Sequence, residues 1–425
     1  MTYDRRRFIQ TTGMGAMMLG SGTLLNTRVA RAADSGPIRL GFISSLTGAQ
    51  APLGQSMLLG ARIAVDQING AGGVLGRKLE LIERDDKARP TDATVAAREL
   101  SGEGVNLLLG CVSSSVALAL SAMLQQEKQV LITCAAHSDR LTKENFARNY
   151  FRVTDNPYMR LRFMAKTLAE RNPEITAWGG IIPDHEYGRT TWNCFEEGLR
   201  EQYQNASDKL TVSAPLRTQY GATDYRNVIG TAMGQPAEGF FVSVYGGDAV
   251  TLLQQARPYG FFTKAKVIAD SANEFVVAKA MKHATPDMWV GTHWYSGAFS
   301  DVQVSNDLFE EYKKRNNGDE YADGWLAEGH AAVIAYARAI QESGNVDTDT
   351  IVTALEGIKF ETATGVRYFR KEDHQAIKPL IMYRLRGNKE ASVGFEVVEH
   401  IKLPGADFID PPTPGKALEF QYIKV

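Results

Sequence analysis

Three consecutive serines, Ser113 to Ser115, are the residues whose type and spacing most directly suggest chemistry. They lie in the stretch GCVSSSVAL, between an apolar run and a stretch rich in alanine and leucine. A serine in this setting can act as a nucleophile, as part of a phosphate-binding loop, or as a hydrogen-bonding group for an anion at the start of a helix. The surrounding residues discriminate between these roles.

Signatures of catalysis are missing around the serines and elsewhere in the sequence. Gly110 is followed two residues later by Val112, so the run does not form the GxSxG turn of α/β hydrolases. No GxxxxGKS or GxxxxGKT loop occurs, and no GxGxxG pattern opens a helix after residue 32. The seven histidines lack the HExxH spacing, and the cysteines include no pair at metal-ligand spacing. We therefore predict no catalytic centre, no metal site and no cofactor, and a protein that is not an enzyme.

The elements that position the serines follow a regular alternation of short β-type runs and helical patterns. Predicted strands of the first series cover residues 38–44, 78–83, 106–111 and 129–134, and predicted helices cover 54–69, 91–102 and 114–126. The series restarts after residue 157, with strands at 177–182, 210–214, 239–244 and 265–269 and with helices between them. Such alternation predicts an α/β fold with two open parallel-sheet lobes.

The last third of the sequence is less regular. A strand is predicted at 288–295, and helices are predicted at 301–316, 324–343 and 348–357. Strand-like residues follow from Gly365 on, with a hairpin around Gly387 and Asn388.

Composition excludes some partners. The 47 lysines and arginines nearly balance the 49 acids, so nothing favours a polyanionic partner, and we expect no nucleic-acid binding.

The first 32 residues have the layout of an export signal. Arg5, Arg6 and Arg7 precede Phe8 and Ile9, an uncharged stretch runs from 11 to 25, and AlaArgAla follows at 30–32. This order is similar to a twin-arginine signal cleaved after Ala32. No later segment approaches the ~20 apolar residues of a membrane helix, so we expect a soluble periplasmic protein.

Ligands of open α/β sheets bind beyond the carboxyl ends of the strands. Those ends carry residues 44–48, 111–115 and 135–138 in the first unit, and 183–188, 245–247 and 270–271 in the second. Ser113 and Ser114 fall where a helix begins, so their hydroxyls and the unpaired N–H groups of the first turn can bind a carboxylate. They can equally cap their own helix, and the spacing leaves both roles open.

An ordered set of short motifs resembles the type I periplasmic solute-binding proteins of the branched-chain amino-acid class. The landmarks are the opening strand followed by LTG, the spacing of Gly54, Gly60 and Ala61, and Asn69 with Gly72 and Gly73. The order continues with GRK at 76–78, DD at 85–86 before Pro90, and the later stretches VNLLLGCVSSSVALAL, YFRV, EYG, TDYRNVI and LLQQARPYG.

The resemblance implies two lobes joined by a three-strand hinge and an ABC permease that receives the ligand. It places the N-terminal lobe at 36–156 and 289–366, and the C-terminal lobe at 157–288 and 367–425. The expected partners are a small-molecule ligand and the permease, and we expect a monomer.

The resemblance also implies a ligand site. A carboxylate-binding serine falls on Ser113, with Ser114 beside it, and the next strand end supplies Ala135 and His137. The remaining positions are Tyr187, Tyr245, Leu53 and, for the ligand ammonium, Asp270. His137 replaces the usual threonine and Leu53 replaces an aromatic residue, so amino acids, amides, aromatic acids and dicarboxylates all stay open as ligands.

Two alternatives to transport also stay open: a ligand-sensing receptor of the same fold, and a periplasmic enzyme. Cys111 and Cys134 end neighbouring predicted strands, which lie about 4.8 Å apart in a sheet, so they form either a disulfide or two buried thiols.

Overall fold

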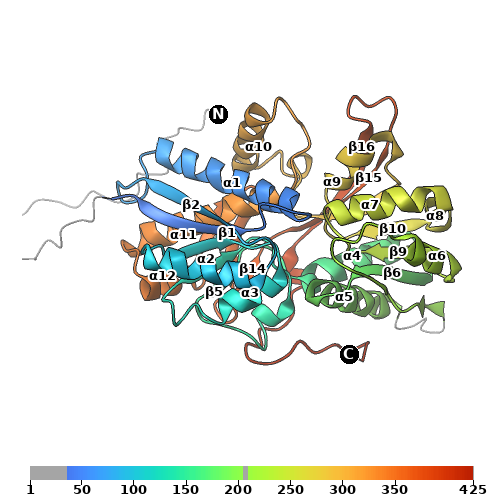
Figure 1. Cartoon of the computed structure of the whole chain (residues 1–425), viewed down its shortest axis with the longest axis horizontal. Helices are drawn as coiled ribbons and strands as arrows, with labels where there is room; N and C mark the ends of the chain where they lie inside the picture. Colours follow the sequence, from blue (N-terminus) through green and yellow to red (C-terminus); the bar gives the residue numbers. More distant parts are fainter. Residues whose placement is uncertain (1–35, 204–208, 425) are drawn as a thin grey trace, which may run out of the picture. The chain divides into compact units, whose positions relative to one another are not determined.

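A five-stranded parallel sheet organises the first part of the computed structural model, which describes residues 36–203 and 209–424 (Figure 1). Its strand order is β2-β1-β3-β4-β5. The strands are β1 (Ile38–Ser44), β2 (Leu79–Asp85), β3 (Leu107–Gly110), β4 (Val130–Thr133) and β5 (Tyr150–Arg152). The runs LLLG and VLIT are buried on both faces, which explains why they read as continuous apolar segments.

Helices cover both faces of this sheet. They are α1 (Ala51–Gly70), α2 (Pro90–Gly102), α3 (Ser114–Ser121), α11 (Trp325–Ser343) and α12 (Thr348–Leu355). Alternate residues of one strand serve the two faces: Leu107 packs with α1 and α11, whereas Leu108 packs with α2 and α3. A short helix η1 (Asp139–Leu141) follows β4.

The second large sheet has eight strands in the order β16-β15-β11-β10-β9-β6-β7, with β8 paired to β6. These strands are β6 (Ala177–Pro183), β7 (Thr211–Val212), β8 (Leu216–Thr218), β9 (Gly239–Val242), β10 (Val267–Asp270), β11 (Met288–Thr292), β15 (Leu380–Gly387) and β16 (Phe395–Leu403). Strands β6 to β11 pair in parallel, and the hairpin β15–β16 adds to β11 in antiparallel orientation.

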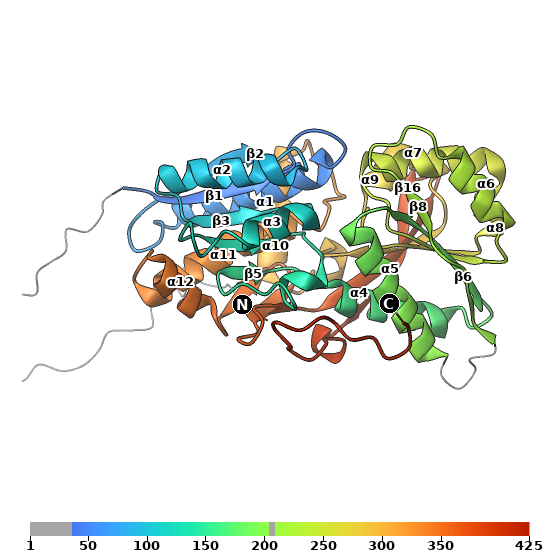
Figure 2. The same cartoon turned by 60° about the horizontal axis from the view of Figure 1, so that its bottom comes forward.

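Helices of the second lobe also form two layers (Figure 2). On one face lie α4 (Pro157–Arg171) and α5 (Glu186–Gln202), which bury Trp178 and Phe241. The other face carries α6 (Arg226–Gly234), α7 (Gly247–Ala256), η3 (Arg257–Tyr259), α8 (Phe261–Lys264), α9 (Val276–Met281) and η4 (Lys282–Ala284). The α/β fold with parallel-sheet lobes and the hairpin near Gly387 are therefore confirmed.

The chain passes three times between the two large sheets: after β5, after β11 and after β14. The third sheet, β12 (Lys359–Thr362), β13 (Gly365–Phe369) and β14 (Ala376–Ile377), packs through Phe360 and Phe369 on the core of the first lobe. Between the second and third crossings lie η5 (Ser296–Ala298) and α10 (Gln303–Arg315), and η6 (Gly405–Asp407) follows β16. The lobe boundary predicted at 366 falls inside β13, whereas the chain crosses only after β14. The lobe boundary predicted at 288 falls at the start of β11, whereas the chain crosses at the end of that strand.

Three further predictions concern the export signal, membrane helices and the cysteines. The predicted export signal, residues 1–32, lies outside the described residues. None of the described helices has the length and apolar character needed to cross a membrane. Cys111, Cys134 and Cys194 are buried free thiols rather than disulfide partners, and burial raises the pKa of each thiol.

Two glycines allow α1 and α11 to approach each other closely. A Cβ atom on Gly60 would overlap the backbone carbonyl of Leu326, and one on Gly329 would overlap the carbonyl of Met57. Neither glycine has a positive φ, so close packing rather than backbone conformation requires them. Because Trp325, the first residue of α11, lines the pocket described below, this contact positions one wall of that pocket.

We expect Gly60→Ala to lower the free energy of unfolding by about 3 kcal/mol, because the clash is with backbone that cannot rotate away. Gly70→Ala, in the last turn of the same helix, is the matched control, since its Cβ would meet no atom within 4 Å. Urea unfolding of both variants measures the difference. Equal stability of the two variants would contradict the packing argument.

Candidate functional site

The strand ends of both lobes contribute to one small pocket. Its lining residues are Leu53, Val112, Ser114, Ala135, His137, Tyr187, Tyr245, Ala272 and Trp325. All of them belong to a single compact unit, residues 37–425. Six of the eight residues expected from the sequence therefore meet, namely Leu53, Ser114, Ala135, His137, Tyr187 and Tyr245.

Each lining residue follows a strand or starts a helix. Leu53 lies in the first turn of α1, and Val112 and Ser114 lie at the start of α3. Tyr187 is in the first turn of α5, whereas Tyr245 and Ala272 follow β9 and β10. Trp325 begins α11 and was missed by sequence reasoning, because the start of a helix far from any predicted strand end gives no signal for a site.

Ser114 holds the pocket together on the side of the first lobe. Its Oγ accepts the backbone N–H groups of His137, at 3.2 Å, and Ser138, at 3.1 Å. A hydroxyl that accepts two hydrogen bonds still has one proton to donate. Ser114 therefore joins the loop after β4 to the start of α3 and retains one O–H donor at the pocket.

Ser113 has a different place from the one the resemblance implies. It is the N-cap residue of α3, but its side chain makes no capping hydrogen bond, and it does not line the pocket. The structure thus puts the neighbouring serine, Ser114, in the pocket lining at the first turn of α3. A shift of one residue is below what spacing arguments resolve.

Asp270 also lies outside the lining, and its carboxylate binds groups of its own loop. Oδ1 accepts the backbone N–H groups of Ala272 and Asn273, at 2.9 and 3.0 Å, and the Asn273 side-chain amide contacts both oxygens. Burial raises the pKa of Asp270 to about 6. This carboxylate shapes the loop after β10 rather than offering a free acceptor to a ligand ammonium.

Aromatic rings form the wall of the pocket on the side of the second lobe. Tyr187 and Tyr245 are perpendicular, with ring centroids 5.3 Å apart. Tyr245 Oη accepts a hydrogen bond from Gln50 at 2.7 Å, and Tyr187 Oη lies 3.2 Å from Ser271 Oγ. Burial raises the pKa of Tyr187 to about 12, so this phenol stays uncharged at neutral pH.

A buried ionic network begins directly behind His137. His137 Nε2 lies 3.5 Å from Asp155 Oδ1 and 3.3 Å from His293 Nε2. Asp155 accepts hydrogen bonds from Arg160 Nε, at 3.1 Å, and Nη2, at 2.7 Å. Burial alone would raise the pKa of Asp155, but Arg160 and Lys378 outweigh it and hold the pKa below its usual range.

The network includes one residue from each of the three chain crossings. Asp155 follows β5, His293 follows β11, and Lys378 lies between β14 and β15. Lys378 Nζ donates to the carbonyl of His293 at 2.9 Å and to Glu328 Oε1 at 2.7 Å, and it lies 3.9 Å from Asp155 Oδ2. The crossings are therefore tied to one another next to His137, which lines the pocket.

His137, Asp155 and His293 bring three potential metal-ligand atoms within 4.8 Å of one another. Asp155 follows His137 by 18 residues, and His293 follows Asp155 by 138 residues, so no local sequence pattern could have indicated this group. However, Asp155 is already paired with Arg160, and Lys378 adjoins it. These two buried cations oppose a divalent cation, and the arrangement fits an ion-paired hydrogen-bond network better than a metal site.

Both imidazoles are uncharged at neutral pH. Burial lowers the pKa of His137 to about 4, and it lowers the pKa of His293 well below its usual value. With both rings neutral, one Nε2 donates and the other accepts across their 3.3 Å contact. His293 Nδ1 lies 2.7 Å from Glu274 Oε1, which fixes the orientation of that ring.

We expect the protein to lose stability on acidification because of His137. Below pH 6.5 the unfolded imidazole takes up a proton, whereas the folded one does so only near its pKa of about 4. The free energy of unfolding should therefore fall by about 3 kcal/mol over this range on account of His137 alone.

Urea unfolding at pH 7 and pH 4.5 tests this expectation in the parent protein and in His137→Gln. The variant should show a smaller loss, and His400→Gln, at an exposed position, should behave like the parent. An equal loss in His137→Gln and the parent would contradict the assignment.

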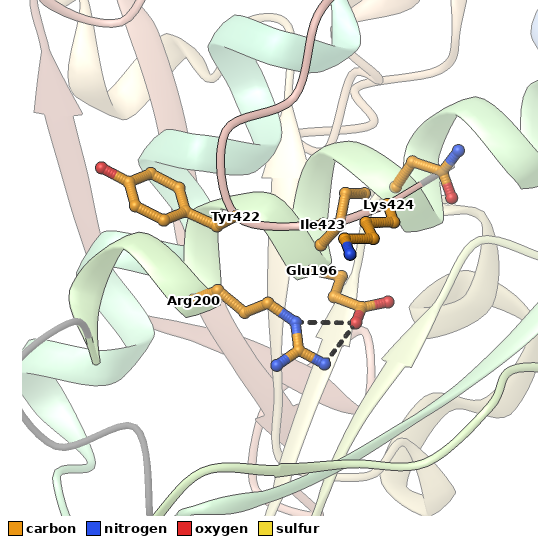
Figure 3. Close-up of a pocket in the computed structure, with 6 residues that line it drawn as sticks. Glu196, Arg200, Tyr422, Ile423 and Lys424 are labelled. Atoms are coloured by element: carbon orange, nitrogen blue, oxygen red, sulfur yellow. Dashed lines mark hydrogen bonds and ion pairs between the residues drawn. The ribbon is translucent and has the colours of Figure 1, made fainter.

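A second hollow lies beside α5, where the C-terminal tail meets this helix (Figure 3). In it, Arg200 pairs with Glu196 at 2.7 Å. Next to this pair, the buried Glu197 accepts the backbone N–H groups of residues 421–423 at 2.6 to 3.1 Å. The hollow is thus formed by attachment of the tail, and it contains none of the site residues expected from the sequence.

The chain belongs to the periplasmic binding protein family, whose model matches residues 37–390. It is 32% identical over 338 residues to the Leu/Ile/Val-binding protein BraC3 of Rhizobium johnstonii, covering 77% of this chain and 86% of that protein. It is 25% identical over 335 residues to the leucine-, isoleucine-, valine-, threonine- and alanine-binding protein of Pseudomonas aeruginosa. That match covers 79% of this chain and 85% of the Pseudomonas protein.

Solved structures show the same fold. A solute-binding protein of an ABC transporter from Rhodopseudomonas palustris, in complex with 3,4-dihydroxybenzoic acid, has a TM-score of 0.75 at 18% identity and covers 87% of this chain and 98% of its own. LivJ of Streptococcus pneumoniae, in complex with isoleucine, has a TM-score of 0.72 at 20% identity. The match covers 87% of this chain and 99% of LivJ. The family match and the relative from Rhizobium johnstonii identify the chain as a solute-binding protein, and the similar proteins named above are binding proteins.

Proposed function

We propose that this protein captures a small carboxylate-bearing ligand in the pocket between its lobes and delivers it to an ABC permease. The observation that carries the proposal is the pocket itself: side chains from the strand ends of both lobes meet there. The similar proteins from Rhizobium johnstonii and Pseudomonas aeruginosa bind amino acids, which supports a ligand of this size.

Capture follows from the arrangement of the three crossings. Opening of the lobes would separate Ser114 and His137 from Tyr187 and Tyr245, and a ligand that contacts both sets stabilises the closed form. A permease that recognises the closed form then discriminates loaded from empty protein. A dissociation constant of about 1 μM corresponds to ~8 kcal/mol, which a charge-assisted hydrogen bond and burial of an apolar ligand can supply.

Delivery to a permease requires that the protein act outside the cytoplasm. The family and the arginine-rich N-terminal sequence support a periplasmic location, with export through the twin-arginine route. We also propose that the protein acts as a monomer.

We expect Ser114→Ala to weaken binding of the best ligand about 10- to 100-fold, because a hydrogen bond to a charged group contributes about 1.5–3 kcal/mol. Isothermal titration calorimetry with leucine, isoleucine and 3,4-dihydroxybenzoate identifies that ligand and measures the change. Ser115→Ala, at an exposed position of the same helix, is the matched control.

Ser114→Thr keeps the hydroxyl and should retain most of the affinity, which separates loss of the donor from loss of folding. Unchanged affinity in a folded Ser114→Ala protein would show that the ligand binds elsewhere.

A further inference from the structure

We infer that the ligand of this pocket is a monocarboxylate with an apolar body and without an ammonium group. The inference rests on the proposed function and narrows it to one chemical class. It follows from the groups that the pocket offers, from the groups that are already engaged, and from the charges that lie behind the pocket.

The pocket offers no carboxylate to an ammonium ion. None of its nine lining residues, all within the described part of the chain, is aspartate or glutamate. The acids nearby are engaged by the protein itself: Asp155 pairs with Arg160, and Asp270 binds the backbone and Asn273. Glu274 accepts the backbone N–H groups of His293 and Gly324 and contacts the His293 ring.

The charges behind the pocket favour an anion. Arg160, Lys378 and Arg367 are buried together with only two carboxylates that pair with them, Asp155 and Glu328. Burial is the main cause that lowers the pKa of His293. The charges of these three cations and of His137 lower this pKa further. Two further acids, Asp270 and Glu274, are buried in the same region. The charges that lower the pKa of His293 are positive, and on that side of the pocket they favour a carboxylate over an ammonium ion.

Arg152 is a fourth buried cation in this region, and its charge acts on the buried carboxyl of Asp139 as well as on His137. Its Nη2 donates to the carbonyl of Ser138 at 2.7 Å, while its Nε and Nη1 have no hydrogen-bond partner in the protein. Ser138 is also one of the two residues whose N–H groups bind Ser114. The loop that carries His137 therefore lies between a buried guanidinium and the pocket, and the positive charge of Arg152 also lowers the pKa of His137.

The lining fits a carboxylate head and an apolar body. Ser114 supplies an O–H donor at the start of α3, where the first-turn N–H groups also favour an anion. The rest of the lining is apolar or aromatic and consists of Leu53, Val112, Ala135, His137, Tyr187, Tyr245, Ala272 and Trp325. Burial of such a body is favourable, whereas an uncompensated ammonium beside it would be costly to desolvate.

Matched pairs of ligands test the inference. Leucine is compared with 4-methylpentanoate, which lacks only the ammonium, and phenylalanine is compared with 3-phenylpropanoate. Calorimetry on the folded protein should give at least tenfold tighter binding for the acid without the ammonium in every pair of which a member binds, and no binding of 3-methylbutylamine or 2-phenylethylamine.

The results separate this inference from the proposed function. If leucine or phenylalanine bound as tightly as its partner or tighter, the inference would be wrong and the capture function would stand. If neither these acids nor 3,4-dihydroxybenzoate nor any amino acid bound, both would be overturned.

A charge placed in the pocket provides the converse test. Ala272→Asp adds a carboxylate to the lining, and Ala272→Asn adds a side chain of nearly the same size without the charge. Relative to Ala272→Asn, the aspartate variant should shift the preference at least tenfold towards the amino acid of each pair. The same preference in both variants would contradict the electrostatic argument.

Discussion

The buried ion pair between Asp155 and Arg160 lies where the connections between the two lobes converge. Asp155 belongs to the first crossing, contacts His137 of the first lobe, and lies 3.9 Å from Lys378 of the third crossing. Arg160, at the start of α4, also donates to the carbonyl of Ser271 in the second lobe. Loss of one partner of such a pair typically costs 3–5 kcal/mol, because an unpaired charge is left buried. The position of the lobes and the shape of the pocket therefore depend on this interaction.

The same network sets the electrical character of the ligand site. His137 has one face in the pocket and its Nε2 beside Asp155, so it connects the ligand to the charged groups at the crossings. Burial keeps its ring neutral, and the surrounding cations reinforce this state. A carboxylate that enters the pocket meets the Ser114 hydroxyl and the cations that act on His137 and His293, while an ammonium meets no acidic side chain in the lining. Stability of the crossings and selectivity for the ligand are thus linked through one side chain.

Ser114 shows how binding and folding share a single group in this pocket. Two backbone N–H groups of the loop after β4 depend on its oxygen, and its proton remains for a ligand. The close packing of α1 on α11 has a similar double role, because Leu53 and Trp325 stand at the first turns of those helices. Small residues at the helix contact, Gly60 and Gly329, therefore affect the pocket without touching a ligand.

The sequence by itself determined the α/β class and the order of most strands and helices, because buried parallel strands read as apolar runs. The family resemblance that the sequence carries named six residues that line the pocket, most of them at strand ends. It could not distinguish Ser113 from Ser114, since the direction of a side chain at a helix start depends on the loop that packs against it. It gave no signal for Trp325, or for the contacts of His137 with Asp155 and His293, which are remote along the chain. Only the tertiary structure decided that Asp270 is engaged by its own loop and that buried cations gather behind the pocket, because both depend on which charges the three crossings bring together.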